Sequence, residues 1–173
     1  NDKIGVIFFS DRIEKFIPPK KGRKHILYII RELLDFKPES KRTNLQGAIE
    51  YLTNVLKKRC TAFVLSDFID DSDFKNALTV ANRKHDVIAM QVYDRRMEEL
   101  PDVGLMRVRD AETGHEQWID TSSKALRNAH HAWWMERQEK LNDIFTRSNV
   151  DSVSVRTDQD YVKALMNLFA KRN

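Results

Sequence analysis

Four aspartates lie within seven residues, directly after an apolar run that is typical of a β-strand. The segment reads Ser-Asp-Phe-Ile-Asp-Asp-Ser-Asp, and its acidic residues are Asp67, Asp70, Asp71 and Asp73. In an open parallel sheet, ligands bind beyond the carboxyl ends of the strands, which is where this loop would lie. Carboxylate oxygens there would suit Mg²⁺, Ca²⁺ or Mn²⁺, although the spacing is not that of an EF-hand.

Helix capping is the alternative role for most of this acidic loop. Asp70, Asp71 and Asp73 precede a predicted helix, and carboxylates at a helix start stabilise it through its free amides and its dipole. We favour that role for these three residues, with Asp71 or Ser72 as the cap. Asp67 differs because it lies directly at the strand end, so it is the candidate metal ligand.

Thr43 is the second candidate, in the sequence Arg-Thr-Asn-Leu-Gln-Gly-Ala-Ile. Thr43 with Gln46 three residues later satisfies the capping-box pattern, so helix capping alone accounts for the threonine. A basic cluster formed by Lys20, Lys21, Arg23 and Lys24 resembles an anion-binding patch at a helix start. We favour a solvated turn for that cluster.

Composition excludes several other classes of protein. The 30 basic and 26 acidic residues give a net charge of +4 that is scattered along the chain, which does not favour a nucleic-acid partner. The single cysteine, Cys60, excludes an internal disulfide and a Cys-rich zinc site and favours a cytoplasmic location. No apolar stretch approaches the roughly 18–20 residues of a membrane span. Glycine-rich phosphate loops, HExxH and GxSxG motifs are absent from the sequence.

The segments that would position these residues alternate between strands and helices. Apolar or β-branched runs predict strands at residues 4–9, 61–65, 87–92 and 152–155, and the last of these is expected at a sheet edge. Residues 12–17 are predicted to pair with the first strand in an antiparallel hairpin that ends at Pro18 and Pro19. Apolar residues at helical spacing predict helices at 26–34, 45–56 with a basic end at 57–59, 74–81 and 161–169. This alternation predicts an α/β fold with a mainly parallel sheet and helices on both faces.

One segment, residues 104–146, interrupts the alternation. Two short runs flank a turn-rich stretch and predict a hairpin, and a long helix follows at about residues 122–146. We expect Trp133 to lie on its apolar side with Leu126, Leu141 and Phe145, and Trp134 to lie nearer solvent.

Taken together, these segments resemble a von Willebrand factor A-type domain, and more narrowly the bacterial family of unknown function numbered fifty-eight. Four runs carry the resemblance: GVIFFSDRIEKFIPPKKGRKH at 5–25, RTNLQGAI at 42–49, FVLSDF at 63–68 and HDVIAMQVYDRRMEELPDVG at 85–104. Members of that family are often encoded beside MoxR-type AAA+ ATPases. The resemblance implies a Rossmann-like sheet and a single domain over residues 1–173.

The resemblance also implies a metal-ion-dependent adhesion site. Thr43 would be its threonine and Asp67 its second acidic ligand, with Ser10 and Asp70 as further binding residues. The primary Asp-x-Ser-x-Ser motif of such a site is absent from the chain, and Ser10-Asp11-Arg12 is the nearest approach to it. We therefore expect the chain to be the C-terminal portion of a longer protein. Mg²⁺ or another divalent cation would bind in the intact protein and not in this portion.

The missing motif predicts a missing strand. In von Willebrand A folds that strand lies at the centre of the sheet, here between residues 4–9 and 61–65. We expect the two neighbouring strands to pair directly, or to accept a strand of another molecule, and the chain to self-associate through exposed edges.

The function expected from these features is a non-enzymatic protein-interaction module. It would act with a MoxR-type AAA+ ATPase in the assembly or maturation of other proteins, an expectation that rests wholly on the resemblance. The alternative is a metal-dependent hydrolase that uses the acidic loop at 67–73. Two-metal enzymes need carboxylates that converge from different strands, which disfavours this alternative.

Overall fold

The computed structural model describes residues 2–70, 72–110 and 112–172. Its strands are β1 (Ile4–Phe9), β2 (Ile13–Lys20), β3 (Thr61–Ser66), β4 (Asp86–Tyr93), β5 (Leu105–Arg109), β6 (Glu116–Asp120) and β7 (Asp151–Arg156). Its helices are α1 (Arg23–Asp35), α2 (Leu45–Val55), α3 (Lys75–Lys84), α4 (Arg95–Glu98), α5 (Lys124–Arg147) and α6 (Tyr161–Ala170). The predicted α/β fold is confirmed.

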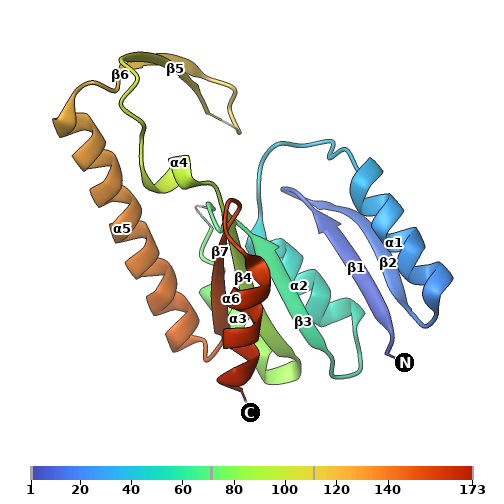
Figure 1. Cartoon of the computed structure of the whole chain (residues 1–173). Helices are drawn as coiled ribbons and strands as arrows, with labels where there is room; N and C mark the ends of the chain where they lie inside the picture. The colour runs from blue at the N-terminus through green and yellow to red at the C-terminus, as the bar shows by residue number, and fades with distance from the viewer. Residues whose placement is uncertain (1, 71, 111, 173) are drawn as a thin grey trace.

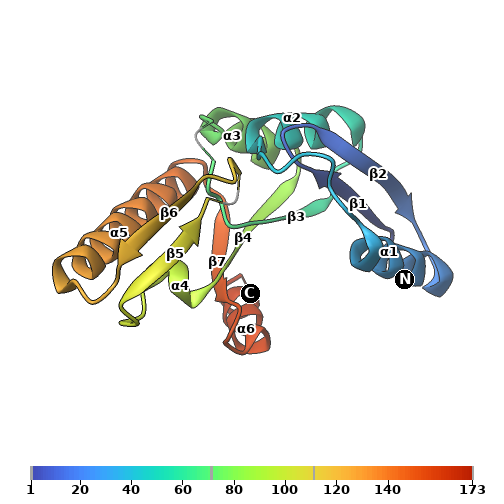
Figure 2. The same ribbon diagram turned by 90° about the horizontal axis from the view of Figure 1, so that it is seen from above.

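A parallel sheet with the order β3-β4-β7 forms the centre of the molecule. In the central strand β4, Val87, Ile88 and Ala89 are buried, because helices cover both faces of the sheet (Figures 1 and 2). Helices α2, α3 and α5 lie on one face, and α6 lies on the other (Figure 2). The alternating strand β7 lies at the edge, as its sequence predicts.

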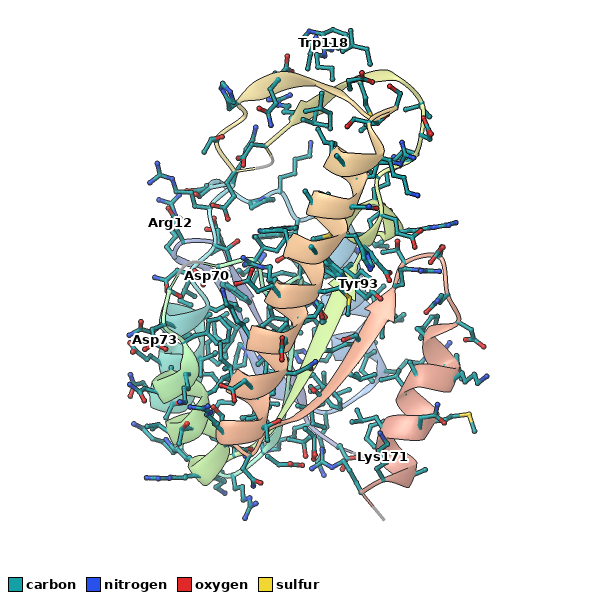
Figure 3. The ribbon with its side chains drawn as sticks, turned by 90° about the vertical axis from the view of Figure 1, so that its left-hand side faces the viewer. Arg12, Asp70, Asp73, Tyr93, Trp118 and Lys171 are labelled. Atoms are coloured by element: carbon teal, nitrogen blue, oxygen red, sulfur yellow. The ribbon has the colours of Figure 1, made fainter. Side chains whose placement is uncertain are left out.

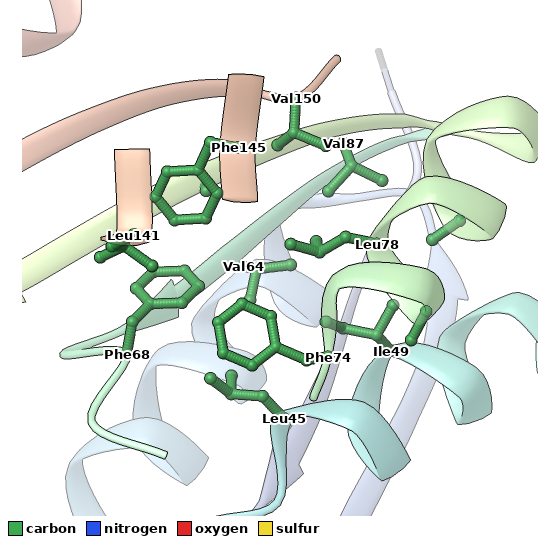
Figure 4. Close-up of a cluster of buried hydrophobic side chains, with 13 residues drawn as sticks. Leu45, Ile49, Val64, Phe68, Phe74, Leu78, Val87, Leu141, Phe145 and Val150 are labelled. Carbon is green, nitrogen blue, oxygen red and sulfur yellow. The ribbon is translucent and has the colours of Figure 1, made fainter. Parts of the chain in front are cut away.

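The main hydrophobic core lies between this sheet and helices α2, α3 and α5 (Figure 4). Its largest members include Leu45, Phe68, Phe74, Leu78 and Phe145. The ring of Phe68 contacts the rings of both Phe74 and Phe145, at centroid distances of 6.1 and 5.1 Å. The loop after β3 is therefore anchored in the core by its own aromatic side chain.

Strands β1 and β2 form a separate antiparallel hairpin, and α1 packs on it through a second core of Phe8, Ile17 and Ile29. The prediction that β2 ends at its two prolines is wrong, because the strand continues to Lys20, which pairs with Ile4. An irregularity in the register accommodates the prolines, which are tolerated at a sheet edge. A side chain could not replace the hydrogen of Gly5, since its Cβ would lie 2.8 Å from the Ile17 carbonyl oxygen.

Strands β1 and β3 are not hydrogen-bonded to each other. Among the described residues, β1 pairs with β2 and β3 pairs with β4. The expected direct pairing of these two strands is therefore wrong, whereas filling by a strand of another molecule stays a prediction. Helix α2 packs against both strands of the hairpin and against α3, so it connects the two sheets on one face.

Two helix boundaries differ from prediction. Helix α2 ends at Val55, so the basic residues 57–59 follow the helix instead of forming its last turn. Helix α3 begins at Lys75 with Phe74 at its N-cap position, and that position makes no side-chain capping bond. Ser72 bonds to Asp70 instead of capping α3.

The predicted hairpin and long helix at residues 104–146 are present as β5, β6 and α5. The predicted orientation of α5 is wrong: Trp134 is 3% exposed, whereas Trp133 is 45% exposed. Trp134 lies seven residues before Leu141 and eleven before Phe145, which places the three on one helix face. The Trp134 ring packs against Tyr93 of β4 at 5.1 Å, a long-range contact that periodicity alone does not reveal.

Candidate functional site at the carboxyl edge of the sheets

Ser10 follows β1 directly and is buried. Its carbonyl oxygen accepts a hydrogen bond from the Asn44 amide at 3.0 Å, and its hydroxyl donates to Glu14 Oε1 at 2.7 Å. The end of β1 is therefore fixed to the residue that precedes α2.

Asn44, and not Thr43, caps α2. The Asn44 side chain accepts a hydrogen bond from the Gly47 amide at 2.8 Å, which is the usual N-cap bond to the third helical residue. The expected capping role of Thr43 is wrong because the helix begins one residue later than the capping-box pattern implies. No hydrogen bond of the Thr43 hydroxyl occurs among the described residues, and the side chain is half-buried.

Asp70 contacts the start of α2 and not the helix that follows it. Its Oδ2 accepts from the Leu45 amide at 2.6 Å and from the Ser72 hydroxyl at 2.8 Å, and its Oδ1 accepts from the Ser72 amide at 2.8 Å. The expectation that Asp70 caps α3 is therefore wrong. Asp73 does accept from the Lys75 amide at the start of α3, at 3.3 Å, as predicted. Asp71 lies outside the described residues.

Two successive amides thus connect two separate elements. Asn44 donates to the end of β1, and Leu45 donates to the loop that follows β3. The amides at the start of a helix lack partners within the helix and attract negative charge, which explains why a carboxylate lies there. We call the surface formed by Ser10, Thr43, Asp67 and Asp70 the carboxyl edge.

Asp67 lies at the end of β3, as predicted, and its carboxylate shapes the loop. Its Oδ1 accepts from the Ile69 amide at 3.0 Å, and its main-chain carbonyl accepts from Gln91 Nε2 at 3.3 Å. Gln91 of β4 is 2% exposed and also accepts from the Ser154 hydroxyl of β7 at 3.0 Å. The Asp67 Oδ2 atom takes part in no hydrogen bond among the described residues.

Phe68 adopts a left-handed backbone conformation, with φ of 56°. This conformation is uncommon for a bulky residue and costs on the order of 1–3 kcal/mol, so the surrounding contacts must hold it. Burial of its ring supplies one such contact. Two hydrogen bonds add to it: the Phe68 amide donates to the Ser66 hydroxyl at 3.0 Å, and the Phe68 carbonyl oxygen accepts from Arg137 Nη2 of α5 at 3.2 Å.

Glu14 is a member of the site that the sequence analysis missed. Its side chain is 5% exposed and accepts from the Ser10 hydroxyl and from the amides of Glu39 and Ser40. The Ser10 hydrogen bond is the largest cause of a lowered pKa for this carboxyl. A signal was available, since Glu14 shares a strand face with Phe16, which packs on Tyr51 of α2.

The donors at the carboxyl edge do not by themselves form a divalent-cation site. Asp70 and Ser10 already bond to protein groups, which leaves Asp67 Oδ2 and the Thr43 hydroxyl without a hydrogen bond in the part of the chain that the structure describes. Within the described ranges, no group of three or more His, Cys, Asp or Glu side chains could hold a metal ion. In Figure 3, Arg12, Asp70 and Asp73 lie along one side of the molecule.

The remaining candidates from the sequence lie elsewhere. His130 and His131 approach the main-chain oxygens of Arg96 and Glu98, both at 3.3 Å, so they attach α5 to α4. The basic cluster at residues 20–24 is exposed around the turn into α1. No helix among the described residues is long and apolar enough to cross a membrane.

Comparison with protein families gives one match that covers most of the chain. The model of the family described as Protein of unknown function DUF58 matches residues 1–140, and the chain therefore belongs to this family.

Curated relatives are uncharacterized proteins of mycobacteria. One from Mycobacterium tuberculosis strain H37Rv is 27% identical over 175 residues, which covers 99% of this chain and 54% of the relative. One from Mycobacterium avium is 25% identical over 158 residues, which covers 90% of this chain and 93% of the relative. The chain thus spans about half the length of the Mycobacterium tuberculosis relative.

Two solved structures share the fold. The conserved hypothetical protein BatB from Bacteroides thetaiotaomicron has a TM-score of 0.58 and 15% identity, and the alignment covers 98% of this chain and 78% of that one. An aerotolerance-related membrane protein from Bacteroides fragilis has a TM-score of 0.60 and 18% identity, and the alignment covers 99% and 80%. The fold is von Willebrand A-like, as the sequence resemblance implied.

Proposed function

We propose that this member of the DUF58 family is a non-enzymatic protein-interaction module that binds its partner through the carboxyl edge. One observation carries the proposal: the amides of Asn44 and Leu45 bond to the end of β1 and to the Asp67–Asp70 loop, so they hold both at the start of α2. These bonds give a preformed surface, on which the Thr43 hydroxyl and Asp67 Oδ2 make no hydrogen bond to any described residue. Preorganised polar groups bind a partner with little further loss of entropy.

The acidic residues support binding better than hydrolysis. Asp70 bonds to the start of α2 and Asp73 to the start of α3, so the two carboxylates are directed to different helices and not to one point. Metal-dependent hydrolases need carboxylates that converge on one point from several elements. The hydrolase that would use the acidic loop at 67–73 is therefore the weaker candidate.

A divalent cation would need more oxygens than Thr43 and Asp67 supply. Thr43 and Asp67 would supply one neutral and one charged oxygen, whereas Mg²⁺ takes six ligands and Ca²⁺ six to eight. The remaining oxygens would have to come from outside these residues, including from an acidic group of the partner. The partner we propose is a MoxR-type AAA+ ATPase in the cytoplasm, and the resemblance to proteins encoded beside such ATPases is the support for it.

Calorimetric titration of the full-length protein with the purified MoxR-type ATPase tests the proposal. Asp67→Asn keeps the acceptor for the Ile69 amide but removes the charge, and Asp73→Asn is the matched control on the same loop. We expect Asp67→Asn to weaken the affinity by about tenfold or more and the control to leave it unchanged. Equal affinities for the three proteins would refute the role of the carboxyl edge.

The hydrolase alternative needs its own assay. A panel of phosphoester and nucleic-acid substrates with Mg²⁺ and Mn²⁺ should give no turnover above a no-protein blank. Turnover that Asp67→Ala abolishes and Asp73→Ala retains would replace the interaction module with the hydrolase.

A further inference from the structure

The loop that carries Asp67 and Asp70 is held by side chains from two elements outside it. Gln91 of β4 donates to the main-chain carbonyl of Asp67 at 3.3 Å. Arg137 of α5 donates to the next carbonyl, that of Phe68, at 3.2 Å. Both bonds act on the backbone between the two acidic residues of the carboxyl edge.

These two bonds support the left-handed conformation of Phe68, together with the bond of its own amide to the Ser66 hydroxyl at 3.0 Å. With φ of 56°, the chain turns so that the Phe68 ring enters the core between Phe74 and Phe145. Asp67 bonds to the Ile69 amide, and Asp70 reaches the Leu45 amide of α2. A relaxed backbone at Phe68 would alter the direction of both carboxylates.

We infer that Arg137 is a positioning residue. It helps to hold Phe68 in this conformation and thereby places Asp67 for its bond to the Ile69 amide and Asp70 for its bond to the Leu45 amide of α2. Arg137 is itself placed by the preceding turn of α5, since its guanidinium lies 6.0 Å from the centre of the Trp133 ring. Helix α5 thus reaches the loop in two ways: Arg137 bonds to the Phe68 carbonyl, and Phe145 contacts the Phe68 ring. This assignment deepens the proposed function, on which it rests for calling the edge a binding surface.

The assignment separates Arg137 from the other cations of α5. Lys140 pairs with Glu136 on the exposed side of the same helix, and Arg147 pairs with Asp143. Each of those pairs joins two residues of α5 that are four positions apart. Lys140→Ala is therefore a matched control, because it removes one positive charge from α5 without touching the loop.

Amide hydrogen exchange in the full-length protein, measured residue by residue, tests the inference. In Arg137→Ala we expect the amides of Leu45, Ile69 and Ser72 to exchange about tenfold faster or more, because the carboxylates that bond them are no longer held in place. The amides of Ile88 and Ala89 in β4 should keep their wild-type rates. Lys140→Ala should change neither set, and Arg137→Lys, which retains a donor, should restore much of the lost protection.

Two results would overturn the inference. One is unchanged exchange at Leu45 and Ile69 in folded Arg137→Ala, which would mean that the loop does not depend on this side chain. The other is equally accelerated exchange in β4, which would make Arg137 a general stabilising residue. Hydrogen exchange needs no partner, so its outcome is independent of the calorimetric test. If Arg137→Ala shows faster local exchange but binds the partner with undiminished affinity, the proposed binding surface is refuted and the positioning role of Arg137 stands.

Discussion

The carboxylate of Asp70 accepts a hydrogen bond from the main-chain amide of Leu45 at 2.6 Å, although the two residues are 25 positions apart. Leu45 is the first residue of α2, so the negative charge lies where the helix has unpaired amides and a positive dipole end. The bond fixes the loop after β3 to the helix that also holds the end of β1.

Loss of this bond should destabilise the protein. Because Asp70→Ala removes a capping charge and leaves the Leu45 amide without its acceptor, we expect the free energy of unfolding to fall by about 1–2 kcal/mol. Asp73→Ala should lower it by less, since that carboxylate is exposed and its bond to Lys75 is longer, at 3.3 Å. Urea denaturation followed by circular dichroism measures both, and a larger loss in Asp73→Ala would contradict the structural assignment.

The two adjacent tryptophans of α5 should differ strongly in their contribution to stability. Trp134 is 3% exposed and packs on Tyr93, so we expect Trp134→Ala to cost about 3–5 kcal/mol. Trp133 is 45% exposed, and Trp133→Ala should cost less than about 1 kcal/mol. The melting temperatures of the two variants show directly which tryptophan contributes more to stability. Similar melting temperatures would contradict the assignment of the Trp134 face of α5 to the sheet.

The sequence was informative where structure depends on neighbouring residues. Continuous apolar runs at β3 and β4, and helical spacing in α2 and α3, predicted these elements because burial requires those patterns. The exact first residue of a helix was harder to predict. A shift of the start of α2 by one residue makes Asn44, and not Thr43, the N-cap residue. The face of α5 was assigned wrongly although the spacing was available, because Trp134, and not Trp133, lies seven and eleven residues before Leu141 and Phe145. The contact of Trp134 with Tyr93, 41 positions away, could not be read from the sequence.

The candidate site was predictable in part for the same reason. Asp67 was placed correctly because a strand end is a local feature. The partners of Asp70 and Ser10 were not predictable, since they lie on α2 and depend on how the two sheets sit around that helix. Glu14 bonds to the nearby Ser10 and also to the distant amides of Glu39 and Ser40, and only its place on the same strand face as Phe16 pointed to it. Arg137 bonds to a carbonyl 69 positions away and belongs to no motif.

Stability should depend on pH through His85. This side chain is fully buried, and burial, with a smaller effect of Lys84, lowers its pKa below the usual 6.5. Between that lowered pKa and 6.5, the unfolded chain binds a proton that the folded chain does not, so stability rises with pH in this window. The full free energy of unfolding is therefore present above pH 6.5, and part of it is lost as the pH falls from 6.5 through the lowered pKa of His85.

Urea denaturation at a series of pH values on both sides of 6.5 checks this dependence. We expect the free energy of unfolding of the wild type to fall as the pH is lowered through the window. In His85→Gln that part of the dependence should disappear, whereas His115→Gln, at an exposed histidine, should retain the wild-type curve. An identical slope in His85→Gln would assign the pH dependence to other groups.

The 173-residue chain should bind divalent metal weakly or not at all. Thr43 and Asp67 offer two free oxygens, too few for the coordination of Mg²⁺ or Ca²⁺. Calorimetric titration with Mg²⁺ and with Mn²⁺ should therefore give no saturable heat in the micromolar range. A stoichiometric isotherm that Asp67→Asn abolishes would show that the carboxyl edge is a complete metal site.

The unpaired side of β3 should make the chain self-associate. Strand β3 is hydrogen-bonded to β4 on one side, and its residues Phe63 and Leu65 are 42% and 56% exposed. A free strand edge with apolar side chains is a template for pairing with another chain. We expect sedimentation velocity of this chain to show association that increases with concentration.

A lysine on this strand should suppress the association, because a charge on an exposed edge opposes pairing between chains. Leu65→Lys tests the edge, and Val80→Lys is the matched control, since Val80 is similarly exposed, at 54%, but lies on α3. The control should associate like the wild type, whereas Leu65→Lys should remain monomeric at the same concentrations. If both variants associate equally, the contact between chains does not involve β3. If the wild type is monomeric at every concentration, the geometry of the β3 edge prevents pairing with another chain, and the strand-filling prediction fails.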